Sequence, residues 1–187
     1  MSVIGVAATE VQGAGGRAAR RGGALRELAV VLGTVLLVVF FLRTFVVEPY
    51  VISGISMEPT FIDSERLLIS KFAPRWESLG RGDIVIFESP REPGKRLIKR
   101  IIGLPGETVV IQDGVVYVDG RAIDEPYLDP TMHDSSQMRP MRLAPDEFFV
   151  LGDNRDRSND SRMIGPIGKA LMIGKALVAF YPRIRLL

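Results

Sequence analysis

The chain has 187 residues, enough for one compact domain with an appendage, and 24 basic and 22 acidic side chains give it a net charge of +2. The first 47 residues carry five arginines and two glutamates, whereas the other 140 hold 19 basic and 20 acidic side chains. A nucleic-acid surface would place positive charge on the folded domain, so this distribution argues against a nucleic-acid partner. The absence of cysteine excludes disulfides and thiolate chemistry.

The first 47 residues predict a basic tail and a membrane anchor. Residues 1–27, rich in glycine, alanine and arginine, are expected to form a disordered tail. Residues 28–42 carry no charge, and a further apolar stretch follows Arg43, whose side chain can reach the membrane interface. The segment 28–47 is therefore about as long as the roughly 20 residues that a transmembrane helix needs. A cleavable signal peptide is the alternative, but the small residues that its cleavage point needs are missing near the end of the segment.

The position of the arginines predicts the orientation of this anchor. Arginines 17, 20, 21 and 26 precede the apolar segment. The positive-inside rule then places the tail in the cytoplasm and residues 48–187 on the outer face, as in a single-pass protein of the plasma membrane. An internal membrane of the thylakoid type would give the same pattern. A lipid bilayer is thus an expected partner.

Residues 48–187 predict a mainly β domain. Glu48-Pro49 is expected to end the helix, because the residue before a proline is displaced from helical space. Short β-like runs between turn residues are expected to form strands at 66–70, 83–88, 96–102, 108–112, 115–118, 147–151 and 176–181. Asp113-Gly114 predicts a two-residue hairpin. Residues 106–146 are expected to form a small insertion or cap, since four prolines and little periodicity mark residues 121–146.

Two side chains are candidates for a nucleophile and a general base. Ser56 lies in a Gly-Ile-Ser-Met-Glu-Pro-Thr turn at residues 54–60, where a hydroxyl can be exposed. Alternation along the expected strand 96–102 places Lys99 on the face of Leu97 and Ile101, and Arg100 on the other face. Desolvation on an apolar face lowers the pKa of a lysine, and a neutral amine is a competent base. Taken singly, the two residues also fit a turn serine and a surface lysine of an edge strand.

A dense polar run at residues 152–162 directly follows the expected strand 147–151. A calcium loop starting at Asp156 fails, because its sixth position is Ser161 instead of glycine and its twelfth is Ile167 instead of glutamate. A zinc site and a Ser-His-Asp triad would both depend on His133, the single histidine. No Ser-x-x-Lys pair or Gly-x-Ser-x-Gly elbow occurs. We therefore expect no metal and no organic cofactor.

Four segments, in this order, closely resemble the motifs of the type I signal peptidases: 56–60 its nucleophile box, 81–85 the strand that follows, 99–107 its lysine box and 152–162 its last box. The resemblance runs from about residue 28 to residue 187. It implies that family's β fold, preceded by one transmembrane helix. It also implies a membrane-bound serine endopeptidase that removes signal peptides from exported preproteins. By motif position, Ser56 is the nucleophile and Lys99 the general base.

The resemblance implies supporting roles for further side chains. Ser158 matches a serine whose hydroxyl orients the lysine amine. Asp153 matches a carboxylate that pairs with Arg100, and Asp160 with Arg162 matches a second, supporting pair. Since Arg100 faces away from the base, we expect Asp153 to hold it without raising the pKa of Lys99.

Oxyanion stabilisation is assigned mainly to the backbone N–H of Ser56. Some family members have a serine two residues earlier, where this chain has Gly54, so the second donor stays open. The substrate is expected to add as an extended strand beside residues 83–88 and the segment before Ser56, with small residues at −3 and −1 in an Ala-x-Ala pattern. Candidate pocket residues, each of which also fits a plain core position, are Tyr50, Ile52, Met57 and Ile98.

Two other functions fit parts of the pattern. A LexA-like self-cleaving repressor shares the Ser-Lys logic and a β fold, but the anchor and the lack of a basic helix-turn-helix domain count against it. A membrane-tethered β-domain adaptor, with Ser56 and Lys99 as structural residues, is the non-enzymatic alternative. It predicts that alanine at either position leaves function intact.

Overall fold

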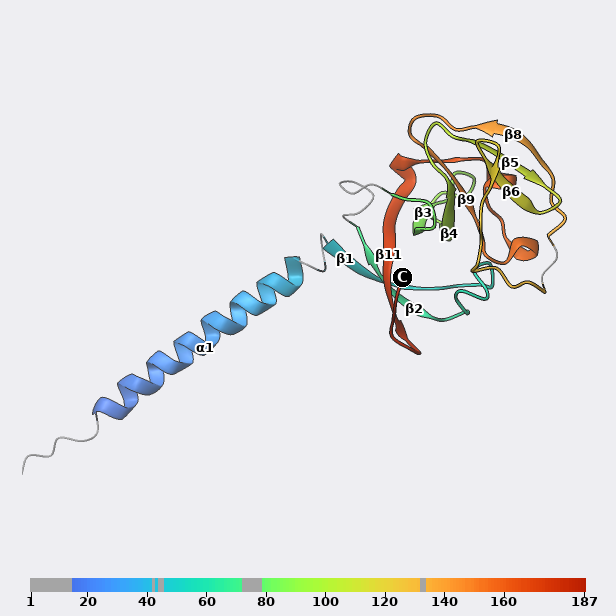
Figure 1. Cartoon of the computed structure of the whole chain (residues 1–187). Coiled ribbons are helices and arrows are strands. Elements are labelled where there is room, and N and C mark those ends of the chain that lie inside the picture. The colour runs from blue at the N-terminus through green and yellow to red at the C-terminus, as the bar shows by residue number, and fades with distance from the viewer. Residues whose placement is uncertain (1–14, 42, 44–45, 72–78, 132–133) are drawn as a thin grey trace, which may run out of the picture. The chain divides into compact units, whose positions relative to one another are not determined.

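The computed structural model describes residues 15–41, 43, 46–71, 79–131 and 134–187 (Figure 1). The chain divides into two units, residues 1–42 and residues 43–187. The first 14 residues of the expected tail and His133 lie outside the described residues. The second unit consists of strands with short helical turns, so the expected mainly β fold is confirmed.

Helix α1 spans Gly15–Phe41. It begins within the segment expected to be disordered, so that expectation is wrong for residues 15–27, where alanine, leucine and arginine favour a helix. It also ends before residue 47, because Val47 already belongs to a strand. Apolar side chains from Leu28 to Phe41 are exposed on the helix. None of the helices in the described residues combines the length and the apolar character that a bilayer crossing requires.

The larger sheet of the second unit has eight strands, and all of its strand pairs are antiparallel. Its order is β1 (Val47–Val51), β2 (Arg66–Ser70), β11 (Met172–Tyr181), β3 (Ile84–Glu88), β4 (Arg96–Gly103), β9 (Glu147–Leu151) and β10 (Ile167–Gly168), with β12 (Arg185–Leu186) paired to β11. Strand β11, from the C-terminal part of the chain, therefore separates β2 from β3, which follow each other in the sequence.

The smaller sheet is built from the segment expected to be an insertion, and its strands lie beside β4 and β9 in Figure 1. Its order is β7 (Arg121–Ala122), β6 (Val115–Val118), β5 (Thr108–Gln112) and β8 (Met138–Arg142). Asp113 and Gly114 both have positive φ, 49° and 75°, between β5 and β6, which confirms the expected hairpin turn. Short helical turns occur at Arg155–Arg157, Ser161–Ile164 and Lys169–Leu171.

The expected strands agree with the observed ones to within about a residue, except that β11 begins four residues earlier, at Met172. Besides the two-residue strands β7, β10 and β12, the sequence patterns missed β1 and β8, each of which contains a proline. Both are edge strands, where a residue without an N–H is tolerated. Pro49 of β1 lies opposite Leu68 of β2, so the chain becomes extended directly before the Ser56 turn.

Strand β4 contributes to all three hydrophobic clusters of the β unit. Ile98 belongs to the cluster around Met57 and Phe61, and Ile101 to the cluster around Val85 and Phe87. Ile102 belongs to a third cluster, between the two sheets. Lys99 and Arg100 lie between these apolar anchors, which hold the backbone of β4 in place.

Candidate active site

Lys99 and Ser56 meet in the β unit, although 43 residues separate them in the sequence. The Lys99 Nζ lies 2.6 Å from the Ser56 Oγ and also donates a hydrogen bond to the backbone oxygen of Ile98, at 2.7 Å. Lys99 is only 2 % exposed. Its partner across the sheet is Val85 of β3, which is fully buried and packs in the same cluster as Leu97. The expected apolar surroundings of this lysine are therefore present.

Burial lowers the pKa of Lys99 to about 8, and the charges of Asp160 and Asp153 partly oppose that shift. The expectation that Asp153 would not raise the pKa of Lys99 is therefore wrong. Asp153 is 2 % exposed, and in such a poorly solvated region its charge still acts on the amine despite its pairing with Arg100. Desolvation nevertheless dominates, so the amine gives up its proton more readily than a solvated lysine does.

Hydrogen bonds between the two ends of the turn, and a bond from Gly54 to Asp63, fix the conformation of the turn that carries Ser56. The backbone N–H of Ile52 donates to the oxygen of Glu65 at 2.9 Å, and Ser64 N–H donates to the oxygen of Ile52 at 3.0 Å. Gly54 has a φ of 95°, a conformation that favours glycine, and its N–H donates to Asp63 Oδ1 at 2.6 Å. These contacts hold the serine hydroxyl at the surface of the first cluster, the one around Met57 and Phe61.

The C-terminal strand β12 holds the same turn from the other side. The guanidinium of Arg185 lies 2.8 Å from a carboxylate oxygen of Glu65 and 4.8 Å from the ring centre of Phe61. It also donates to the backbone oxygen of Thr60. Glu65 is a buried acid at the end of the turn, so Arg185 supplies the charge that its carboxylate needs.

The polar run at residues 152–162 is bonded to the serine turn itself. The Asn154 N–H donates to the backbone oxygen of Ser56 at 3.1 Å. A side chain on Gly152 would begin 2.2 Å from Ser158 Oγ and 2.5 Å from that same Ser56 oxygen. Only glycine allows the two segments to approach so closely, which is the reason for this residue at the start of the run.

The two expected ion pairs of this run are present. Arg100 binds Asp153 through two hydrogen bonds, of 2.9 and 2.6 Å, and Arg162 binds Asp160 at 2.9 and 3.0 Å. Asp160 also accepts the N–H of Gly152 at 3.0 Å. Both carboxylates are buried, and each is bound by an arginine through two hydrogen bonds. The run therefore brings two negative charges close to Lys99, each paired with a positive one.

The expected contact of Ser158 with the lysine amine is not formed. Ser158 Oγ is buried and has no hydrogen-bond partner among the described residues. The two hydrogen bonds that Lys99 Nζ donates there go to Ser56 and Ile98. Ser158 nevertheless lies beside the Ser56 backbone, since its Oγ and the Ser56 oxygen both border the space that a side chain on Gly152 would fill.

Of the two groups considered as oxyanion donors, the Ser56 N–H is free and the Gly54 N–H is not. No group in the described part of the chain accepts a hydrogen bond from the Ser56 N–H, which is therefore free to bind an oxyanion. The N–H of Gly54 is already bonded to Asp63, so Gly54 is not available as the second donor. The sequence carried no signal for Asp63, because its contact depends on how the turn closes.

The expectations for the substrate need correction. Strand β3 pairs with β4 on one edge and with β11 on the other, so no peptide can add beside residues 84–88. Ile52, Met57 and Ile98 are buried core residues of the first cluster, between 0 and 4 % exposed, and Tyr50 packs against them. Among the described residues, no group of His, Asp and Glu side chains is placed to hold a metal ion.

A serine hydroxyl within hydrogen-bond distance of a buried lysine of lowered pKa is the geometry needed by serine proteases that use lysine where others use histidine. Comparison with known proteins identifies the family of this chain. The family model described as "Signal peptidase, peptidase S26" matches residues 25–181. The chain therefore belongs to the signal peptidase family, peptidase S26, and is a serine endopeptidase of the signal peptidase I type. The resemblance drawn from the four motifs is confirmed.

Two sequence relatives agree with this assignment. Signal peptidase I P of Bacillus subtilis subsp. natto is 38 % identical over 156 residues, which cover 79 % of this chain and 84 % of the relative. Probable signal peptidase I-2 of Synechocystis sp. (strain ATCC 27184 / PCC 6803 / Kazusa) is 38 % identical over 162 residues, 83 % of this chain and 73 % of the relative. A crystal structure of a signal peptidase I from Enterococcus faecalis V583 is 34 % identical, with a TM-score of 0.46, and covers 52 % of this chain and 95 % of its own. The sequence relatives give no support to the LexA-like or adaptor interpretations.

Proposed function

We propose that this protein cleaves N-terminal signal peptides from exported preproteins, with Ser56 as nucleophile and Lys99 as general base. The observation that carries the proposal is the 2.6 Å contact between Lys99 Nζ and Ser56 Oγ, in a chain of the signal peptidase family. The lowered pKa of Lys99, about 8, supports the base, because a neutral amine can accept the hydroxyl proton over that same contact.

The reaction then proceeds in two halves. As Ser56 Oγ attacks the carbonyl carbon of the scissile peptide bond, its proton passes to the Lys99 amine and the carbonyl oxygen becomes an oxyanion. The ammonium returns this proton to the leaving nitrogen as the C–N bond breaks, which frees the mature protein and leaves an ester on Ser56. Water then attacks the ester, Lys99 takes its proton and returns it to Ser56 Oγ, and the signal peptide leaves with a new carboxylate.

Several side chains are proposed to support these steps. The free N–H of Ser56 binds the oxyanion. Ser158 is proposed to orient the amine once Lys99 is protonated, since an ammonium has a further proton to donate and the Ser158 hydroxyl is buried nearby without a partner. The pairs Arg100–Asp153 and Asp160–Arg162 hold the polar run against the serine turn.

The substrate is proposed to lie extended along β1, which ends at Val51, shortly before Ser56, and is an edge strand of the larger sheet. Of the four candidate pocket residues, only Tyr50 is partly exposed and is proposed to contact the substrate. Small side chains at −3 and −1 are proposed because Ile52, Met57 and Ile98 are packed in the core and leave no deep pocket beside β1.

Cleavage of a purified preprotein in detergent by the wild type, Ser56→Ala and Lys99→Ala tests the proposal. We expect the wild type to cut after an Ala-x-Ala site and both variants to be folded and inert, because each lacks one half of the proton transfer. Lys95→Ala is the control, since it removes a half-exposed lysine four residues earlier and should cleave at the wild-type rate. Equal activity in all variants, or no cleavage by the wild type, would contradict the proposal.

The pH dependence of kcat/KM provides a second prediction. Only neutral Lys99 can act as base, so kcat/KM should rise with pH through the pKa of about 8 and fall roughly tenfold per pH unit below it. Initial rates between pH 5 and 10 measure this limb. A profile that stays level down to pH 6 would argue against a lysine base.

We further propose that the apolar segment from Leu28 up to β1 anchors the protein in the plasma membrane, with the tail in the cytoplasm and the β unit outside. Fifteen uncharged residues in succession and the exposed apolar side chains of α1 support this. Membranes washed with alkaline carbonate should retain the protein with residues 1–47 still attached, as read by mass spectrometry. Release into the wash, or an N-terminus beyond residue 47, would contradict the anchor.

A further inference from the structure

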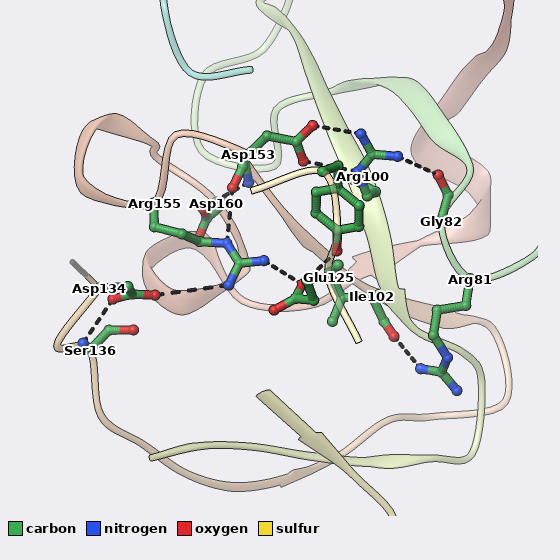
Figure 2. A network of polar contacts seen from close by, with 12 residues as sticks. Arg81, Gly82, Arg100, Ile102, Glu125, Asp134, Ser136, Asp153, Arg155 and Asp160 are labelled. Carbon is green, nitrogen blue, oxygen red and sulfur yellow. Dashed lines mark hydrogen bonds and ion pairs between the residues drawn. The ribbon is translucent and has the colours of Figure 1, made fainter. Parts of the chain in front are cut away.

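The segment between β7 and β8 reaches from the smaller sheet to the polar run of the active site. Glu125, Tyr127 and Asp134 of this segment contact Arg100 or Arg155, and Figure 2 shows these two arginines on either side of Asp153. The sequence predicted only an insertion here. These contacts raise the question of what the segment does for the active site.

The first contact is made by Tyr127. Its ring centre lies 3.8 Å from the guanidinium carbon of Arg100, a cation–π distance, and the ring packs against the third cluster. The N–H groups of Arg100 bind Asp153, the backbone oxygen of Gly82 at 3.0 Å and Thr60 Oγ1 at 3.2 Å. Tyr127 thus covers one face of a guanidinium whose edges are held by hydrogen bonds.

The second contact is made by Glu125. Its carboxylate accepts hydrogen bonds from Arg155 Nη2 and from the hydroxyl of Tyr127. Arg155 is buried and also donates to the backbone oxygen of Gly152 at 3.2 Å, which is the glycine packed against Ser56. Burial, together with this bond to Glu125, raises the pKa of Tyr127, so its hydroxyl remains a donor at every working pH.

These contacts form a closed ring: Tyr127 to Arg100, Arg100 to Asp153, along the chain to Arg155, and through Glu125 back to Tyr127. We propose that Tyr127 and Glu125 are positioning residues of the active site. They fix Arg100 and Arg155, and thereby keep Asp153 in place beside Lys99 with its charge balanced by Arg100. This inference rests on the proposed Ser56–Lys99 mechanism. Neither residue touches the reacting atoms.

The expected consequence is electrostatic as well as geometric. The charged groups around Lys99 are Asp153 with its partner Arg100, and Asp160 with its partner Arg162. Strand β3 faces Lys99 with the apolar Val85, and the serine turn faces it with the Ser56 hydroxyl. Loss of the Tyr127 ring would free Arg100 to move, leave the charge of Asp153 less compensated and so raise the pKa of Lys99.

Two substitutions at residue 127 and one at residue 125 test this in the full-length protein in detergent. Tyr127→Leu removes the ring, Tyr127→Phe keeps the ring but removes the hydroxyl, and Glu125→Gln removes the charge that Arg155 binds. Tyr117→Leu is the matched control, because Tyr117 lies in β6 of the smaller sheet and belongs to none of the three apolar clusters. The readouts are kcat, KM and the acid limb of kcat/KM against pH for a preprotein substrate.

We expect Tyr127→Leu to lower kcat roughly tenfold at little change in KM, because a displaced catalytic group costs rate while substrate contacts persist. Its acid limb should move to higher pH, by roughly half a unit. Tyr127→Phe and Glu125→Gln should show smaller changes in the same direction, and Tyr117→Leu none. If Tyr127→Leu does not fold, the other two variants decide by the same readouts.

Unchanged kcat and an unchanged acid limb in folded Tyr127→Leu, or in Tyr127→Phe and Glu125→Gln together, would overturn the inference. That result leaves the proposed function standing as long as Ser56→Ala is inert and the wild-type limb lies near pH 8. An active Ser56→Ala would instead overturn the proposed function, and the inference with it.

Discussion

The burial of one amine governs the arrangement of this active site. Lys99 lies on β4, whose other residues anchor three apolar clusters, so its charged form loses hydration that no ion pair with a described residue replaces. Its hydrogen bonds go to a neutral hydroxyl and a backbone carbonyl instead. The same burial that disfavours the charged lysine prepares it as a base, and the serine turn brings the proton that it would take.

Two carboxylates near this amine raise its pKa and so oppose the effect of burial, and the fold limits how far they do so. Asp153 and Asp160 each pair with an arginine, which allows the polar run to approach the lysine while their charges are balanced. The run is joined to the serine turn through Asn154 and through the close approach at Gly152. The nucleophile, the base and the charges around them therefore form one connected structure, to which the smaller sheet adds Glu125 and Tyr127.

Local patterns predicted most of the strands and the central pair of residues. Alternation in β4 placed Lys99 on an apolar face, and four motifs in order identified Ser56 as its partner. Residues that act through long-range contacts had no such signal. Tyr127 lies in a proline-rich segment, and its role depends on the position of that segment against Arg100 in the folded protein. Strand order was equally inaccessible, because nothing in the sequence indicates that β11 enters between β2 and β3. That strand occupies the edge where we had expected the substrate.

The state of the Lys99 amine can be measured directly. The chain has five lysines, so side-chain NMR signals of isotopically labelled lysine can be assigned by substituting them one at a time. A titration of the Lys99 signal in the folded wild-type protein should give a midpoint near pH 8. A midpoint at or above about 10, the value of a solvated lysine, would contradict the claim that burial has prepared this residue as the base.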